Sequence, residues 1–373
     1  MSVNTQDPIA LQQRAELGDV AAAIDLAFHY ESAGDPDSAV QWMNKAADSG
    51  NPHAKMQRAA WILYGENFER DEHKALCEVE EVAHQGNAGN ARVFLSVLLA
   101  YGIGCDRNWA KAVEWIALEA EGGNEHCLTQ LQLLQADAGA QPLQISDIGL
   151  AARYAANNDV LNWQVETKKC IAVSPNVEVF PNLAPAAWRK HVIKTARPLL
   201  YGAHVKDANT GLRIRDPMRT NTVALIDLWR SDLIFYALCA RIANATGSPV
   251  NYQEPPNILN YSRGQTYQAH FDFIDPDVEA FKEELEQQGQ RSKTPLIYLN
   301  DKYVGGETEF PHARCAYKGV AGDLLVLHNT LEDGQPDRNS LHVGTPPSSG
   351  EKWVFSTRIR TKPQVAQIWS GAA

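Results

Sequence analysis

The chain has 373 residues, of which 44% are hydrophobic and 21% charged, as in a soluble globular protein with more than one compact core. No apolar run is long enough to span a bilayer, and residues 1–10 lack the basic patch and apolar stretch of a cleavable signal, so we expect neither. The six cysteines stand singly rather than in C-x-x-C pairs. This argues against a disulfide framework or a zinc site and favours a cytoplasmic location.

The net charge of -11 is concentrated in the first part of the chain. Residues 1–140 carry 21 acidic and 9 basic side chains, a net charge of -12, so the remainder carries +1. An acidic surface repels phosphate, and we therefore expect no nucleic-acid partner there. The pattern favours a solvated helical surface over a docking site for a basic partner.

Residues 1–140 repeat themselves with a period in the mid-thirties. Gly50-Asn51, Gly86-Asn87 and Gly123-Asn124 recur at spacings of 36 and 37, and Ala39–Trp42 returns as Ala112–Trp115. Such a period, with small residues at fixed offsets, indicates stacked helical hairpins. The small residues allow close helix packing, and the glycines end helices in a left-handed cap. This stretch resembles Sel1-like repeats, relatives of the tetratricopeptide repeat. The alternative is an unrelated helical bundle.

The remainder of the chain changes from helical to β-rich patterns. Residues 141–175 are predicted to form a connector with a helix at Ile148–Asn157, and residues 176–373 a second domain that begins with helices near Ala184–Leu200 and Leu233–Thr246. Short β-rich runs follow at Ile258–Tyr261, Tyr267–Phe273, Leu296–Leu299, Asp323–Leu327 and Trp353–Thr361, with a charged helical insertion at Asp277–Gln290. Short strands separated by glycine and proline turns predict a sandwich or jelly roll. The predicted fold class is α+β multidomain.

The residues with the clearest chemical potential are His270, Asp272 and His342. Residues two apart on a strand share one face, so His270 and Asp272 point the same way. Two histidines and one carboxylate form the facial triad of non-haem iron oxygenases, which leaves three positions open. An isolated H-x-D triplet is more often an ordinary surface strand pair, and the surrounding residues decide between the two.

Lys352 follows His342 by ten residues, across a turn rich in proline and serine. We expect the chain to reverse there and to present this cation from a neighbouring strand. A dicarboxylate that chelates iron at one end needs a positive charge at its other end, which a lysine supplies. An exposed lysine on an edge strand is the alternative.

Residues from about 175 to 362 resemble the prolyl 4-hydroxylase group of 2-oxoglutarate dioxygenases. The resemblance rests on the order and spacing of the segments Tyr261–Asp272, Tyr298–Asn300, Gly305–Pro311, Gly319–Leu325, Asp337–His342 and Gly350–Trp353, with Arg215–Asn221 upstream. It implies a double-stranded β-helix (jelly-roll) domain with supporting helices. It also implies Fe(II), 2-oxoglutarate and O2 as cofactor and cosubstrates, with ascorbate as reductant.

The resemblance further implies roles for single residues. His270, Asp272 and His342 match the iron ligands, and Lys352 matches the residue that pairs with the distal carboxylate of 2-oxoglutarate. Hydrogen bonds to the same carboxylate region are expected from Tyr261 and Thr308. Contacts with substrate are expected from Tyr267 and Arg291. Ordinary packing is the alternative for these last four residues.

One position departs from the family pattern, which has a second tryptophan five residues after Trp353. Here Arg358 takes that place, with Arg360 two residues further on. In the family the tryptophan helps form the wall that faces a peptide substrate. A guanidinium there suits a carboxylate instead, so we predict that Arg358 and Arg291 bind substrate, with a solvent-facing strand residue as the alternative.

These features predict an enzyme that hydroxylates a ring C–H of a proline-like substrate, at C3 or C4. Arg358 slightly favours a free cyclic amino acid, L-proline or L-pipecolate in a biosynthetic pathway, because only a free acid has a carboxylate to offer. The alternative is a prolyl residue in a peptide or protein docked by the repeats. A third interpretation is an inactive repeat scaffold. Stereochemistry and oligomeric state are left open by the sequence.

Overall fold

A computed structural model of the protein describes residues 7–85, 90–137, 148–157, 161, 163, 167–207 and 209–364. These residues form two compact units. Residues up to 131 and residues 148–156 form the first, called the repeat unit; residues 132–137 and those from 157 onward form the second, called the catalytic unit. The boundaries expected near residues 140 and 175 stay predictions. In the described ranges no helix has the length and apolar character needed to cross a bilayer.

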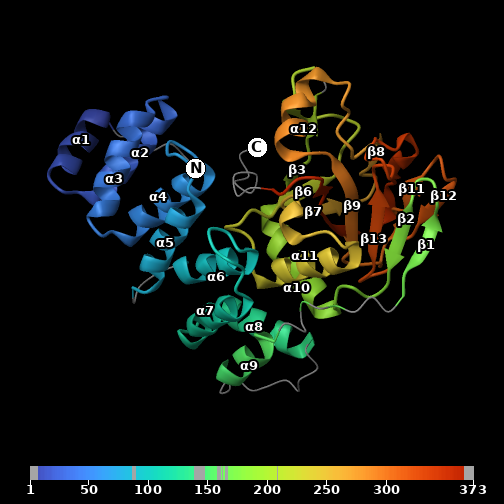
Figure 1. Cartoon of the computed structure of the whole chain (residues 1–373), viewed down its shortest axis with the longest axis horizontal. Coiled ribbons are helices and arrows are strands. Elements are labelled where there is room, and N and C mark those ends of the chain that lie inside the picture. The colour runs from blue at the N-terminus through green and yellow to red at the C-terminus, as the bar shows by residue number, and fades with distance from the viewer. Residues whose placement is uncertain are drawn as a thin grey trace. The chain divides into compact units, whose positions relative to one another are not determined.

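The repeat unit is built from short helices; from α1 to α7 each packs against the next along the chain, and α7 packs against α9 (Figure 1). The helices are α1 (Pro8–Glu16), α2 (Val20–Ser32), α3 (Pro36–Asp48), α4 (Pro52–Tyr64), α5 (Glu72–Ala83), α6 (Ala91–Tyr101), α7 (Trp109–Glu121), α8 (Glu125–Asp137), whose last turns belong to the catalytic unit, and α9 (Ile148–Ala155). Stacked helical hairpins were predicted for this region, and the structure confirms them.

The recurring Gly-Asn dipeptide ends one helix and begins the next. Gly50 and Gly123 adopt φ of 85° and 92°, the left-handed region that suits a helix C-terminus. Asn51 and Asn124 then accept hydrogen bonds from backbone N–H groups three residues ahead, at 3.0 and 3.2 Å, as N-caps do. The copy that begins at Gly86 lies outside the described residues.

Small residues at equivalent repeat positions allow close helix contacts. Ala39, Ala75 and Ala112 are fully buried, and Trp42 and Trp115 lie beside them with less than a tenth of their surface exposed. An alanine at these positions removes no polar group from water and lets helix backbones approach. The phase of the repeat therefore specifies the apolar interior of this unit.

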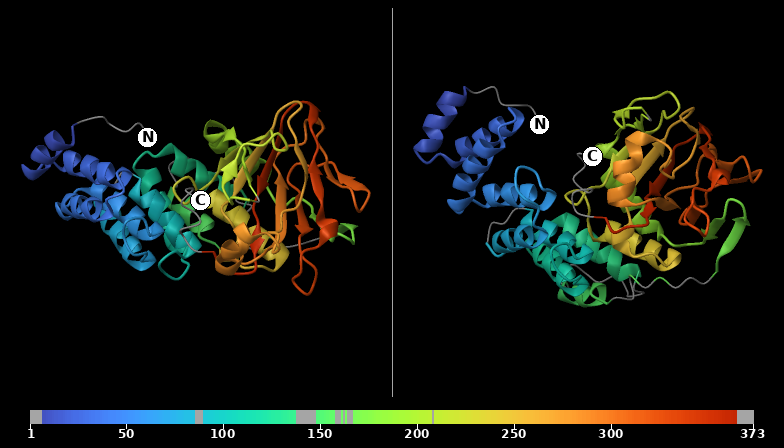
Figure 2. Two further views of the ribbon diagram at one scale, coloured as in Figure 1. Left: turned by 90° about the horizontal axis from the view of Figure 1, so that it is seen from above. Right: turned by 45° about the horizontal axis from the view of Figure 1, so that its top comes forward.

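The catalytic unit contains two antiparallel sheets (Figure 2). The larger sheet has the order β1 (Lys169–Ala172), β2 (Val177–Phe180), β13 (Leu324–His328), β9 (Arg291–Tyr298), β16 (Lys352–Ser356), β7 (Asn257–Tyr261), β6 (Thr222–Leu225) and β3 (Tyr201–Gly202), with β17 (Ile359–Arg360) also on β9. The smaller sheet has the order β12 (Cys315–Tyr317), β11 (Thr308–Phe310), β14 (His342–Gly344) and β8 (Tyr267–His270). Two further two-stranded sheets stand outside them, the hairpin of β4 (Val205–Lys206) with β5 (Arg213–Ile214) and the pair of β10 (Val304–Gly305) with β15 (Pro347–Ser349).

The two sheets share one apolar core. Tyr298, Leu325 and Val354 from the larger sheet pack in the same cluster as Phe310 from the smaller one. Helices support the larger sheet: Phe235 of α11 (Leu233–Thr246) stacks on Phe355 of β16 at 6.3 Å between ring centroids. Helix α10 (Ala186–Ala196) also contacts α11. The predicted jelly-roll domain with supporting helices is confirmed.

Two predicted strands end earlier than expected, and both ends lie beside the site described below. The run Tyr267–Phe273 stops pairing at His270, and the run Trp353–Thr361 is interrupted after Ser356. The charged insertion is a short 3-10 turn followed by α12 (Lys282–Gln288). Because Asp272 and Arg358 lie at these interruptions, they are free of ladder geometry and can face each other.

Candidate functional site

The candidate metal ligands lie together at one end of the smaller sheet. His270 closes β8 and His342 opens β14, and the two residues are directly paired in register. Asp272 follows two residues beyond the end of β8. One ligand atom from each of the three residues lies within 4.8 Å of those of the other two. The geometry thus brings His270 and Asp272 together with His342, which lies 70 residues after Asp272 in the sequence.

Both histidines are oriented as neutral nitrogen ligands. The Nδ1 atom of His270 lies 2.7 Å from the Gln268 carbonyl, and that of His342 lies 3.0 Å from the Ser340 carbonyl. As donors to these carbonyls, the Nδ1 atoms leave Nε2 unprotonated for a metal. Burial lowers the pKa of both rings, that of His270 well below its usual value. The donor set therefore fits a divalent first-row metal such as Fe(II).

The Asp272 carboxylate is buried and held from two sides. Its Oδ2 accepts a hydrogen bond from Thr294 at 2.8 Å and lies 3.6 Å from His342 Nε2. Its Oδ1 accepts one from Arg358 Nη2 at 3.0 Å. Burial alone would raise the pKa of this carboxyl, but Arg358 and the two histidines hold it well below its usual range. The carboxylate is therefore charged and fixed in orientation.

Lys352 lies in the larger sheet, not on a strand adjacent to His342. It opens β16, which pairs with β7 and β9, whereas β14 belongs to the smaller sheet. The expectation of a neighbouring strand was therefore wrong, because the chain crosses between the two sheets at this turn. Lys352 is 2% exposed, and burial together with the Lys318 cation lowers the pKa of its ammonium group to about 7.

A small cavity between the sheets connects Lys352 to the candidate metal ligands. The Nζ atom of Lys352 lies 3.4 Å from Thr308 Oγ1. The centroids of the Tyr261 and Tyr298 rings lie 5.3 and 5.5 Å from the same atom. Thr308 is held in turn by the Tyr298 hydroxyl at 2.8 Å. Lys352, Tyr261 and Thr308 line this cavity together with His270, Asp272 and His342. Their assigned roles stay predictions.

A larger cleft of about 500 Å³ adjoins the small cavity at Asp272. Its walls come from the β4–β5 hairpin, the segment after β8, α12 and the arginines of β9 and β17. Three residues line both this cleft and the small cavity, namely Tyr267, Asp272 and Arg358. Tyr267 lies flat against His270, at 3.4 Å between ring centroids, and Arg219 covers its ring at 4.5 Å. A substrate in the cleft would meet the metal site across these residues.

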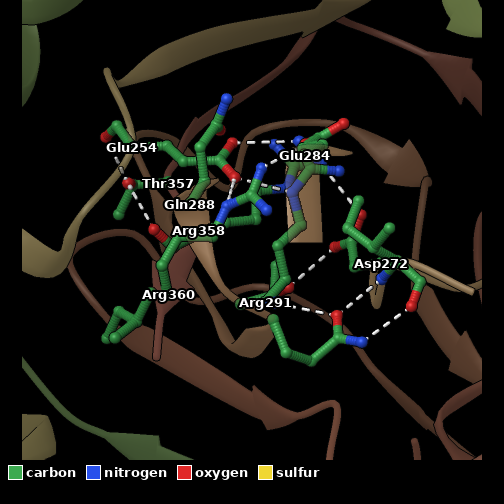
Figure 3. A network of polar contacts seen from close by, with 12 residues as sticks. Glu254, Asp272, Glu284, Gln288, Arg291, Thr357, Arg358 and Arg360 are labelled. Atoms are coloured by element: carbon green, nitrogen blue, oxygen red, sulfur yellow. Dashed lines mark hydrogen bonds and ion pairs between the residues drawn. The ribbon is translucent and has the colours of Figure 1, made fainter. Parts of the chain in front are cut away.

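The two arginines expected to bind a substrate carboxylate contact carboxylates of the protein instead. Arg291 makes a two-pronged contact with Glu254, at 2.7 and 3.1 Å, and Arg358 contacts Asp272 (Figure 3). Arg360 also pairs with Glu254, and the three positive charges hold the pKa of that buried carboxyl at about 2, although burial alone would raise it. The predicted clamp therefore stays a prediction that these contacts do not support.

Sequence reasoning missed three residues that position the site. Thr294 donates a hydrogen bond to Asp272, and Glu254 accepts one from Arg291. The hydroxyl groups of Tyr298 and Thr308 are hydrogen-bonded to each other. Tyr298 lies inside a segment that carries the family resemblance, and its position next to a metal-site cavity could have been inferred from that segment. Thr294 and Glu254 carry no local signal, because only the folded register places them beside their partners.

Comparisons with known proteins agree with this site. Residues 256–360 match the 2OG-Fe(II) oxygenase superfamily. The chain is 30% identical over 224 residues to a probable prolyl 4-hydroxylase 3 of Arabidopsis thaliana, and the match covers 55% of this chain and 72% of that protein. The chain belongs to the prolyl 4-hydroxylase family. It is therefore an enzyme of the dioxygenase class, as the sequence predicted, and the family implies Fe(II), 2-oxoglutarate and O2.

Two solved structures align with portions of this prolyl 4-hydroxylase homologue. The viral collagen prolyl hydroxylase of Paramecium Bursaria Chlorella virus-1 in complex with 2-oxoglutarate aligns at a TM-score of 0.40 and 18% identity, covering 52% of this chain and 99% of that one. A Sel1 repeat protein from Oxalobacter formigenes aligns at a TM-score of 0.30 and 26% identity, covering 33% and 95%.

Proposed function

We propose that His270, Asp272 and His342 bind Fe(II) and that the small cavity holds 2-oxoglutarate, with Lys352 at its far end. The proposal is supported by the grouping of the three ligand atoms within 4.8 Å and by the buried cation on the opposite wall of the same cavity. When bound, iron with 2-oxoglutarate and dioxygen supplies the oxidising power to hydroxylate an unactivated C–H bond, with succinate and carbon dioxide as by-products.

The protein's own residues orient the reactants and exclude water. The Lys352 ammonium group pairs with the distal carboxylate of the cosubstrate, and Thr308 and Tyr261 complete that end of the cavity. Asp272 and the two imidazoles would hold the metal, and Asp272 and Tyr267 also line the cleft, where Tyr267 would separate substrate from the His270 ring. Ascorbate as the reductant stays a prediction.

We further propose that the substrate is a prolyl residue within a peptide or protein, hydroxylated at C4. One observation carries this choice over a free cyclic amino acid: Arg291 and Arg358 are already paired with Glu254 and Asp272. A free carboxylate would have to compete with these buried partners, and losing either pair would leave a buried charge uncompensated. The related protein is a probable prolyl 4-hydroxylase, which favours the same choice.

Mass spectrometry of competing substrates tests this proposal. The enzyme, with iron(II), ascorbate and 2-oxoglutarate, is given proline-containing peptides, L-proline, L-pipecolate and the amides of both amino acids. We expect hydroxylated peptide, with the position fixed at C4 by nuclear magnetic resonance, and no preference for an acid over its amide. Faster turnover of the free acids than of peptides and amides would favour the free amino acid and restore the carboxylate clamp.

A further inference from the structure

The two oxygens of the Asp272 carboxylate have different surroundings. Oδ2 faces His342 Nε2 at 3.6 Å and accepts the Thr294 hydroxyl at 2.8 Å. Oδ1 accepts a hydrogen bond from the Arg358 guanidinium at 3.0 Å. The carboxylate thus approaches His342 most closely through Oδ2, while Oδ1 is engaged by a cation.

Among the described residues, Arg358 forms an ion pair with the Asp272 carboxylate alone. Its Nη1 lies at 3.4 Å from Ser356 Oγ, which is a weak contact, and its buried Nε has no hydrogen-bond partner among the described residues. The neighbouring arginines are arranged differently, since Arg291 and Arg360 share Glu254, and Arg360 also pairs with Glu284 (Figure 3). Arg358 is 9% exposed and lies where the strand is interrupted. In the described ranges Asp272 is the single carboxylate that forms an ion pair with it.

We infer that Arg358 is a positioning residue that keeps Asp272 a one-oxygen ligand of the iron. A carboxylate that bound through both oxygens would fill a fourth coordination site and leave two open instead of three. A bound iron would need these three positions for 2-oxoglutarate, which offers two ligand atoms, and for dioxygen. To turn Oδ1 onto the metal, Asp272 would have to give up a buried, charge-assisted hydrogen bond. This inference rests on the proposed iron site.

Arg358 acts on metal affinity in two opposing directions. It pre-orients the ligand, which favours binding, but its positive charge repels a divalent cation and weakens the carboxylate as a donor. A change in affinity alone therefore does not distinguish positioning from charge. The coordination of the bound metal does, because a merely structural role for Arg358 would leave the number of open sites unchanged.

The test counts water molecules on Mn(II) bound in place of iron, without 2-oxoglutarate, by electron–nuclear double resonance in 17O-labelled water. We expect about three waters in the full-length wild-type protein and about two in Arg358→Met, in which Oδ1 is free to bind. Arg358→Lys, which can still donate to Oδ1, should restore about three. Arg291→Met removes a comparable arginine whose partner Glu254 keeps Arg360, and it should leave the count unchanged.

Several outcomes would overturn the inference. Three waters in Arg358→Met, or two in the wild type, would show that Arg358 does not set the coordination, and the wild-type measurement stands even if Arg358→Met does not fold. His270→Ala separates this failure from that of the proposed function. If that variant bound Mn(II) as tightly as the wild type, the metal would lie elsewhere and both proposals would fall.

Discussion

Two ion pairs, one from each unit of this protein, differ in their exposure to solvent. In the repeat unit Lys55 pairs with Glu81, whose side chain is 59% exposed. In the catalytic unit Glu254 pairs with Arg360, and the two side chains are 11% and 1% exposed. Exposed pairs contribute little to stability, whereas a buried pair that loses one partner leaves an uncompensated charge. The Lys55–Glu81 pair should therefore tolerate the loss of one partner, whereas the Glu254–Arg360 pair should depend on both.

The same contrast appears in how each unit is held together. The repeats depend on local signals, a glycine that ends one helix and an asparagine that caps the next. The catalytic unit depends on pairs far apart in the chain, such as Arg358 with Asp272, which are separated by 86 residues. Substitutions should therefore have graded, local effects in the repeats and large, site-wide effects in the catalytic unit.

The largest effect is expected at the metal ligands. His270→Ala should abolish hydroxylation while leaving both units folded, since one of three ligands is lost and no apolar core is disturbed. Product formation and metal content are measured together, with circular dichroism as the check on folding. His312→Ala, at a histidine outside the ligand group, is the control. Near-normal turnover of His270→Ala with iron supplied would contradict the triad.

Glu254→Gln tests the buried network without touching a metal ligand. It leaves Arg291 and Arg360 without a full counter-charge, and we expect a loss of about 3–5 kcal/mol in the free energy of unfolding of the catalytic unit. Glu81→Gln in the repeat unit breaks an exposed pair and should cost under about 1 kcal/mol. Denaturant titrations of both variants give the comparison. Equal losses of unfolding free energy in Glu254→Gln and Glu81→Gln would contradict the expected difference between the buried and the exposed pair.

Lys352→Ala should act on cosubstrate binding. Loss of a buried charge-assisted pair of about 2–4 kcal/mol corresponds to an affinity for 2-oxoglutarate that is roughly 30- to 1000-fold weaker. Calorimetric titration of the Mn(II)-loaded protein measures it, with Lys318→Ala as a control at the neighbouring cation. If the affinity of Lys352→Ala is unchanged, the cosubstrate lies elsewhere.

The pH dependence of this affinity follows from the lowered pKa of Lys352. Since the pKa of the buried ammonium group is about 7 in the empty site, the lysine is charged below that pH and loses its proton above it. A bound dicarboxylate requires the charged form, so binding above pH 7 takes up a proton and the affinity should fall by about tenfold from pH 7.5 to 8.5. Titrations in buffers of different ionisation enthalpy measure the uptake. Proton release, or an affinity that rises with pH, would contradict this assignment.

Patterns that repeat locally could be predicted from the sequence, and pairings across the fold could not. The Gly50-Asn51 stops, the buried alanines and the helix Leu233–Thr246 follow from spacing alone. The grouping of His270 with His342 was predicted because the family resemblance supplied a long-range constraint. It is matched by the geometry, although the liganding itself stays a prediction.

Arg358 shows where that reasoning reached its limit. Its charge indicated that a carboxylate should lie nearby, and one does, but it belongs to Asp272 rather than to a substrate. A sequence gives the charge of a side chain and not its partner, which depends on where two strands are interrupted. The same holds for Glu254, whose partners come from β9 and β17.

The smallest effect is expected at a repeat cap. Asn51→Ala removes the side-chain acceptor for the Ala54 N–H and should cost about 1 kcal/mol of stability in the repeat unit. Asn51→Asp keeps an acceptor at the helix N-terminus, where its negative charge is favourable, and should cost less. Turnover of a short peptide should match the wild type in both variants, because the capped helix lies outside the catalytic unit. Denaturant unfolding and peptide turnover are measured side by side. If Asn51→Ala lowered peptide turnover in proportion to its stability, the two units would depend on each other, and the separation drawn between local and long-range effects would not hold.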